Sequence, residues 1–163
     1  RDLNDEDDVD IAQLRLNDPD FVLRLTVVRG EGLTAADVSL FGPRTSDPYV
    51  TVRLGAKSWS TPTIPKDLNP VWDDATVLLP VHHVYQTVTF EVYDADEYTA
   101  DDLIGVAKEI PLERVIGGQD VRLPLSPDYS DNKSGAGFLW VRAQVLDLAE
   151  DEEALATRLS RRS

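Results

Sequence analysis

Val92–Gly105 reads VYDADEYTADDLIG, the end of one strand, an acidic crest and the start of another strand. Asp94, Asp96 and Asp102 lie in this stretch with no basic residue between them. Like charges held this closely destabilise a loop unless a cation offsets them. Calcium takes about six to eight oxygen ligands, and carboxylates are prominent among them. The crest is therefore either a site for a hard cation or a solvated acidic turn.

Alternating apolar residues predict strands on both sides of the crest. In residues 87–94, Val88, Phe90 and Val92 share one face, which is typical of a half-buried strand. The other predicted strands are 21–28, 48–55, 57–64, 71–81, 103–112, 119–127 and 137–148. Eight short strands without a convincing helix predict an all-β fold, an eight-stranded antiparallel β-sandwich with Greek-key links and flanking tails.

Two strands carry a further local signal. Pro62 lies within 57–64 and favours an edge position, because proline cannot donate a hydrogen bond to a neighbouring strand. Asp73 and Asp74 interrupt the alternation of 71–81 and predict a β-bulge there.

The two ends of the chain differ from its strand-rich middle. Residues 1–20 hold eight acidic and two basic groups and are interpreted as an acidic N-terminal flank. Within them, residues 9–16 alternate weakly, so an edge strand is the alternative. Residues 149–163 are acidic first and arginine-rich last, which predicts a C-terminal tail with a short helix, or alternatively a frayed end. The β-sandwich is expected to span residues 21–148.

Composition narrows the classes of function. A formal net charge of −14 argues against nucleic acid as a partner and against constitutive adhesion to an anionic membrane. The absence of cysteine excludes disulfides and thiolate metal sites, and it suits a reducing cytosol. No apolar run approaches the roughly 18 residues of a membrane span. A chain that starts at Arg1 is expected to be a piece of a longer protein, and no catalytic motif appears, so an enzyme is not expected.

A second acidic loop lies between the strands 21–28 and 48–55, and it contains Asp37 and Asp47. Loops of a β-sandwich gather at its two ends. If this loop and the crest emerge at the same end, five carboxylates converge, and two calcium ions would nearly balance their charge.

Four motifs in this chain resemble the successive signatures of a C2 domain. They are SDPYV at 46–50, LNPVW at 68–72, VYDAD at 92–96 and DLIG at 102–105, in family order, and the resemblance covers residues 21–146. It implies an eight-stranded sandwich that binds calcium at one tip and then docks on phospholipid. Because the first strand leads directly into SDPYV and a further strand closes the chain, the resemblance also implies the permuted arrangement called type II topology.

The resemblance implies a calcium site made by two loops. The expected ligands are Asp37, Asp47, Asp94, Asp96 and Asp102, with Thr99 as a further hydroxyl ligand. Asp101 and Glu97 are interpreted as solvated acids. Nine residues separate Asp37 from Asp47, which makes this loop longer than is usual in the family. The alternative for Asp37 is therefore a position displaced from the site.

Apolar residues accompany these acids. Leu40 and Phe41 in the long loop, and Tyr98 on the crest, are expected to insert into a bilayer; the alternative is that they fold back onto the sandwich rim. The predicted function is a calcium-dependent phospholipid-membrane-binding module with about two Ca2+ ions, cytoplasmic and peripheral to an anionic membrane when calcium binds. The alternatives are a calcium-independent module with a protein partner, or the targeting domain of a larger enzyme or membrane-trafficking protein.

Overall fold

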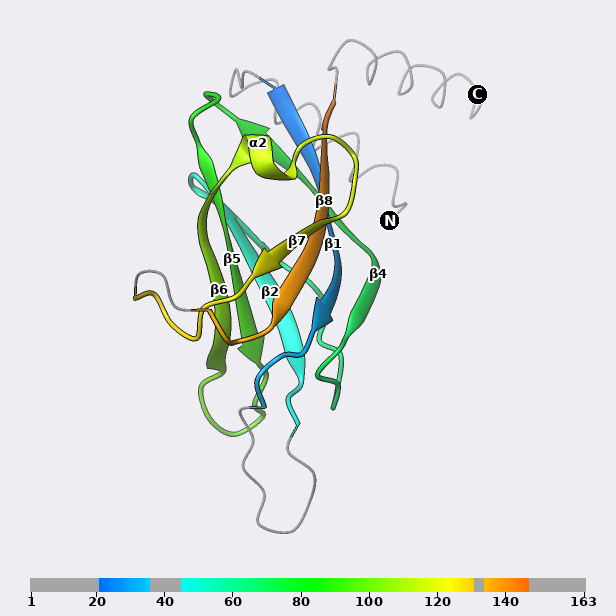
Figure 1. Ribbon diagram of the computed structural model, residues 1–163, viewed down its shortest axis with the longest axis vertical. Helices are drawn as coiled ribbons and strands as arrows, with labels where there is room; N and C mark the ends of the chain where they lie inside the picture. Colours follow the sequence, from blue (N-terminus) through cyan, green and yellow to red (C-terminus); the bar gives the residue numbers. More distant parts are fainter. Residues whose placement is uncertain (1–20, 36–44, 131–133, 147–163) are drawn as a thin grey trace.

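The computed structural model describes residues 21–35, 45–130 and 134–146, and these form a two-layered β-sandwich (Figure 1). Two antiparallel four-stranded sheets have the strand orders β4-β1-β8-β7 and β3-β2-β5-β6. The strands are β1 (Phe21–Glu31), β2 (Pro48–Leu54), β3 (Lys57–Ser60), β4 (Val71–Val81), β5 (Thr87–Asp94), β6 (Asp102–Pro111), β7 (Val121–Pro124) and β8 (Phe138–Leu146). The predicted eight-stranded all-β sandwich is confirmed.

The closing strand β8 lies between β1 and β7, next to the first described strand. This neighbourhood is the one that the permuted, type II arrangement requires, so the predicted topology is confirmed. The weakly alternating residues 9–16 lie outside the described residues, as does the tail from residue 147 on.

Both local strand predictions are confirmed. β3 lies at the edge of its sheet, next to β2 alone, although it ends at Ser60, before Pro62. The register between β1 and β4 shifts between Val27 and Arg29, and Asp73 of β4 has a φ of +22° at that point. The extra residues therefore form the bulge that the paired aspartates predicted.

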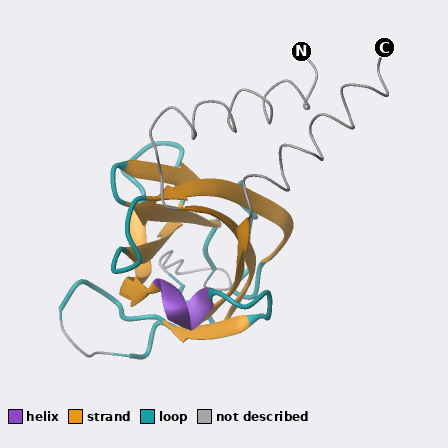
Figure 2. Ribbon diagram, turned by 90° about the horizontal axis from the view of Figure 1, so that it is seen from above, coloured by secondary structure: helices purple, strands orange, loops and turns teal. Residues whose placement is uncertain are grey.

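The one-turn helix α2 (Leu112–Val115) has no counterpart among the elements that the sequence pattern predicts. Leu112 and Val115 are both buried, but four residues are too few to produce a helical period, and Leu112 extends the apolar pattern of the strand before it. After α2, Ile116 pairs with Ala143 of β8, so this turn carries the chain from one sheet to the other (Figure 2).

The core lies between the sheets and is built by the inward-facing residues of each strand. Phe90 of β5, Leu25 of β1 and Leu139 of β8 are among its largest fully buried side chains. Side chains alternate between the two faces of a strand, so each strand directs one of its faces into this close-packed interior. β1 and β5 end, and β2 and β6 begin, at the lower end of the sandwich in Figure 1, which we call the tip.

Candidate functional site

Asp47 joins three segments of the tip through its own atoms. Its backbone N–H donates to Asp94 Oδ1 at 2.7 Å, and its carbonyl oxygen accepts the N–H of Ala95 at 2.9 Å. Its carboxylate Oδ1 accepts the N–H of Lys66, in the connection between β3 and β4, at 2.7 Å. The SDPYV segment and the acidic crest, 47 residues apart, are thus held together at the same end of the sandwich.

Strand register brings two more of the predicted ligands side by side. Asp94, the last residue of β5, is paired with Pro48 of β2 on one side and with Asp102 of β6 on the other. Directly opposed residues of an antiparallel pair have Cβ atoms about 4.5–5.5 Å apart, so Asp94 and Asp102 are neighbours. Asp94 is only 2% exposed whereas Asp102 is exposed. A buried carboxylate needs hydrogen-bond donors, and the Asp47 N–H supplies one to Asp94.

Asp96 shapes the crest, residues 95–101, by capping its backbone. Its Oδ1 accepts the N–H groups of Tyr98 at 3.0 Å and Thr99 at 3.4 Å. The Tyr98 N–H, followed by the Thr99 side chain, lowers the pKa of Asp96 below its ordinary value, since each donor stabilises the ionised form. Asp96 therefore stays a carboxylate at mildly acidic pH, which is the form that a metal ligand needs.

Asp101 is exposed, in agreement with its interpretation as a solvated acid, but it also has a structural role. Its Oδ1 accepts the Asp96 N–H at 2.9 Å, and its Oδ2 accepts the hydroxyl of Tyr49 on β2. The Tyr49 hydroxyl, followed by the Asp96 N–H, lowers the pKa of Asp101. Burial, followed by the hydrogen bond to Asp101, raises the pKa of Tyr49 to about 12. Asp101 thus closes the crest on itself and fastens it to β2.

The oxygen ligands available at the tip suit calcium, although the described side chains are not arranged as a complete metal site. Four of the predicted ligands, Asp47, Asp94, Asp96 and Asp102, are described, and each offers carboxylate oxygens, the ligands that calcium prefers. Within residues 21–35, 45–130 and 134–146, no three Asp, Glu, His or Cys side chains are gathered closely enough to hold a metal ion. The Oδ1 atoms of Asp47, Asp94 and Asp96 accept backbone N–H groups instead. The predicted ligand Asp37 and the predicted membrane contacts Leu40 and Phe41 lie outside the described residues.

Tyr98 is an almost fully exposed aromatic residue of the crest. It is 91% exposed, the highest value among the described large hydrophobic side chains. A ring of this size in full contact with water is the kind of surface that gains from burial against another molecule. Thr99, the predicted hydroxyl ligand, follows it and contacts Asp96.

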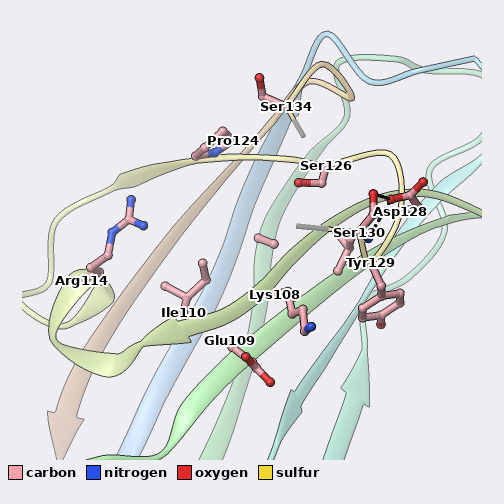
Figure 3. A pocket seen from close by; sticks show the side chains of 12 residues that line it. Lys108, Glu109, Ile110, Arg114, Pro124, Ser126, Asp128, Tyr129, Ser130 and Ser134 are labelled. Atoms are coloured by element: carbon pink, nitrogen blue, oxygen red, sulfur yellow. Dashed lines mark hydrogen bonds between the residues drawn. The ribbon is translucent and has the colours of Figure 1, made fainter. Parts of the chain in front are cut away.

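A pocket away from the tip lies between β6 and the connection from β7 to β8 (Figure 3). Lys108 and Arg114 line it, and Tyr129 belongs to its rim. The Tyr129 hydroxyl donates to Glu91 of β5, which also accepts a hydrogen bond from Arg53 Nε of β2 at 2.5 Å. Glu91 is 5% exposed although it points away from the core, so this network fixes the connection on the outer face of the sheet.

Comparison with known proteins identifies the fold family. The family model described as "C2 domain" matches residues 21–125. Extended synaptotagmin-1 of Pongo abelii is 32% identical over 149 residues, which are 90% of this chain and 13% of that protein. Multiple C2 and transmembrane domain-containing protein 1 of Homo sapiens is 35% identical over 159 residues, 93% of this chain and 15% of that protein. The chain thus spans about a seventh of the length of these relatives.

Solved structures agree with this match. A single C2 domain of plant extended synaptotagmin 1 superposes with a TM-score of 0.64 at 26% identity, covering 78% of this chain and 95% of that one. A calcium-bound pair of C2 domains from extended synaptotagmin 2 gives a TM-score of 0.64 at 27% identity, covering 78% and 46%. Among the described residues of this chain, no helix is long and apolar enough to cross a membrane. From its motifs, its strand topology and these matches, the chain belongs to the C2 domain family.

Proposed function

We propose that this chain is a calcium-dependent phospholipid-binding module that uses its tip. The observation that carries the proposal is the position of Asp47, Asp94 and Asp102 at the ends of three adjacent strands, with Asp47 clamped to the crest. Carboxylates concentrated at one end of a sandwich repel each other and repel anionic lipid until a cation offsets them. A structural relative with calcium bound, from extended synaptotagmin 2, adds support.

The proposed ligands come from both loops. They are Asp37, Asp47, Asp94, Asp96 and Asp102, with Thr99 adding its hydroxyl. Calcium bound there would supply positive charge and open coordination positions for lipid phosphate oxygens. The chain's own part is to hold the carboxylates ionised and close together, which the backbone clamp at Asp47 and the lowered pKa of Asp96 favour.

Calcium would change the charge of the domain substantially. Residues 21–146 contain 17 acidic and 11 basic groups, a net charge of −6. About two calcium ions would add +4 and leave about −2, with the change concentrated at the tip. Repulsion from an anionic bilayer would fall accordingly. Leu40, Phe41 and Tyr98 would then insert beside the ions, each contributing roughly 1.5–3 kcal/mol if fully buried.

The test compares two doubly substituted variants of this 163-residue chain by calorimetry and vesicle sedimentation. Asp94→Asn/Asp96→Asn removes two charges from the tip, while Glu109→Gln/Glu113→Gln removes two charges at the opposite end, where β6 stops and α2 begins. We expect calcium-binding heat, and calcium-dependent pelleting with phosphatidylserine vesicles, to be lost in the first variant and kept in the second. An unchanged calcium-binding heat in the first variant would refute the proposed calcium site.

A second function has one specific observation in its favour. Four of the described tip carboxylates, those of Asp47, Asp94, Asp96 and Asp101, already accept backbone N–H groups, as expected of a tip that is stable without metal. A calcium-independent protein-interaction module would pellet with vesicles equally in calcium and in chelator, or not at all.

We further propose that the domain spans residues 21–148 and that it is located in the cytoplasm. We also propose that it is the targeting part of a larger protein, since the chain covers 13% and 15% of the two relatives described above.

A further inference from the structure

The outer face of the sheet β4-β1-β8-β7 gathers arginines and aromatic rings. Register places Arg29 of β1, Trp140 of β8 and Arg122 of β7 in one row, and Glu31 opposite Phe138 in the next. We call this surface the arginine–aromatic face, and it consists of Arg24, Arg29, Glu31, Asp120, Arg122, Phe138, Trp140 and Arg142. It lies on the sheet opposite to the one that carries β2 and β5, and so apart from the Glu91 network.

Stacking holds two of these guanidinium groups in place. Arg29 lies 4.4 Å above the ring of Trp140, and Arg122 lies 3.5 Å from the ring centre of Phe138. Glu31 Oε2 accepts hydrogen bonds from Arg122 Nε at 3.2 Å and from Trp140 Nε1 at 3.1 Å. A guanidinium that stacks on a ring keeps in-plane N–H donors available for a further carboxylate, because stacking uses its face rather than its edge.

Two of the four arginines on this face have no ion-pair partner among the described residues. Asp120 pairs with Arg142 at 2.8 Å and Glu31 pairs with Arg122, whereas no described carboxylate lies within ion-pair distance of Arg24 or Arg29. The other acids of the sheet, Asp73 and Asp74, lie on the edge strand β4. Guanidinium groups without an ion-pair partner suit an acidic occupant.

We propose that the arginine–aromatic face is the docking surface for the chain's own acidic flank, residues 1–20. The flank carries eight acidic and two basic groups and is joined directly to Phe21, the first residue of β1. Arg24 and Arg29 lie on that strand, the latter about 27 Å from Phe21 at roughly 3.4 Å per residue. Extended chain covers up to about 3.5 Å per residue, so the acids of residues 5–10 can reach both arginines.

Two considerations favour a tethered peptide over an anionic bilayer or a second copy of the chain. Glu31 and Asp120 lie among the arginines, so a flat anionic surface would meet repulsion, whereas a single peptide segment can place carboxylates at the arginines alone. Arginine and aromatic residues are enriched in protein-binding surfaces. A short tether also gives the flank an effective concentration of about millimolar order, which a separate molecule rarely reaches. The proposal does not depend on calcium binding at the tip.

The test neutralises four acids of the flank in the full chain. Asp5→Asn/Glu6→Gln/Asp7→Asn/Asp8→Asn is compared with Glu150→Gln/Asp151→Asn/Glu152→Gln/Glu153→Gln, which removes the same charge from the other tail. The readout is the indole N–H signal of Trp140 in a heteronuclear NMR spectrum, with Trp59 and Trp72 as internal references. We expect the flank variant to shift the Trp140 signal and leave the references in place. Added salt should produce the same shift in the unchanged chain and a much smaller one in the flank variant.

A reciprocal measurement follows the flank itself. Backbone amide signals of residues 5–10 should shift in Arg24→Gln/Arg29→Gln and stay unchanged in Lys57→Gln/Lys66→Gln, which lowers the charge equally on the other side of the molecule. No shift in either measurement, or an equal effect from the C-terminal substitutions, overturns the proposal. A Trp140 shift that depends on protein concentration also overturns it, because it would assign the face to a second copy of the chain.

Discussion

Removal of one hydroxyl, by Tyr129→Phe, tests whether the Glu91 network fixes the connection between β7 and β8. The Tyr129 hydroxyl donates to Glu91, whose other described donors are Arg53 and the Tyr93 side chain. A hydrogen bond to a charged group contributes about 1.5–3 kcal/mol. Tyr129 is 44% exposed, so water replaces part of the lost bond, and Tyr93 still contacts the carboxylate. We therefore expect a loss of about 1–2 kcal/mol.

Thermal and urea unfolding followed by circular dichroism measure this loss. A destabilisation of 1 kcal/mol corresponds to a melting temperature lower by roughly 4 °C for a domain of this size. Tyr85→Phe is the matched control, because the same atom is removed from a ring that is 87% exposed. A Tyr129→Phe midpoint within 1 °C of that control would refute the idea that this hydroxyl carries stability.

Three further predictions concern the core, a close backbone approach and the crest. Phe90→Ala should cost about 3–5 kcal/mol in urea unfolding, because Phe90 is fully buried between the sheets; a loss below 1 kcal/mol would contradict that packing. Gly137→Ala should cost at least about 2 kcal/mol, since its φ is +91° and a Cβ would lie 2.5 Å from the Gly32 carbonyl oxygen, whereas Gly117→Ala, with nothing near its Cβ, should cost less. Tyr49 should titrate near pH 12 by NMR, and Asp101→Asn should lower this pKa. The ordinary tyrosine pKa is about 10, so Tyr49 loses its hydroxyl proton at lower pH in the unfolded chain than in the folded one. The contribution of Tyr49 to folding stability therefore declines as pH rises from about 10 to about 12. A Tyr49 pKa that is unchanged in Asp101→Asn would count against the contact.

The strands could be predicted because each has a face packed on the core. In β5, Val88, Phe90 and Val92 alternate with polar residues, and this period of two is a direct consequence of strand geometry. The one-turn helix α2 could not be predicted in this way. Its two buried residues are contacts of tertiary structure rather than members of a helical repeat, so the helix depends on packing that the sequence does not display.

The candidate site was likewise only partly predictable from the sequence. Spacing and motif order were enough to predict that Asp47 and Asp94 share one end of the sandwich, because both sit where strands of one sheet begin or end. The role of Asp101 was missed, since its partner Tyr49 is 52 residues away and their contact depends on the register of β2 and β5 and on the path of the crest. A count of carboxylates cannot separate an acid that closes a loop from one that faces water.

The contacts on the outer face of the second sheet form a continuous line from the β7–β8 connection to the crest. Tyr129 bonds to Glu91, Glu91 contacts Tyr93, and Tyr93 stacks on Tyr49 with ring centres 5.5 Å apart. Tyr49 in turn bonds to Asp101, whose second oxygen accepts the backbone N–H of the proposed ligand, Asp96. The crest is therefore held by its two strands and also by a row of side chains that crosses the sheet.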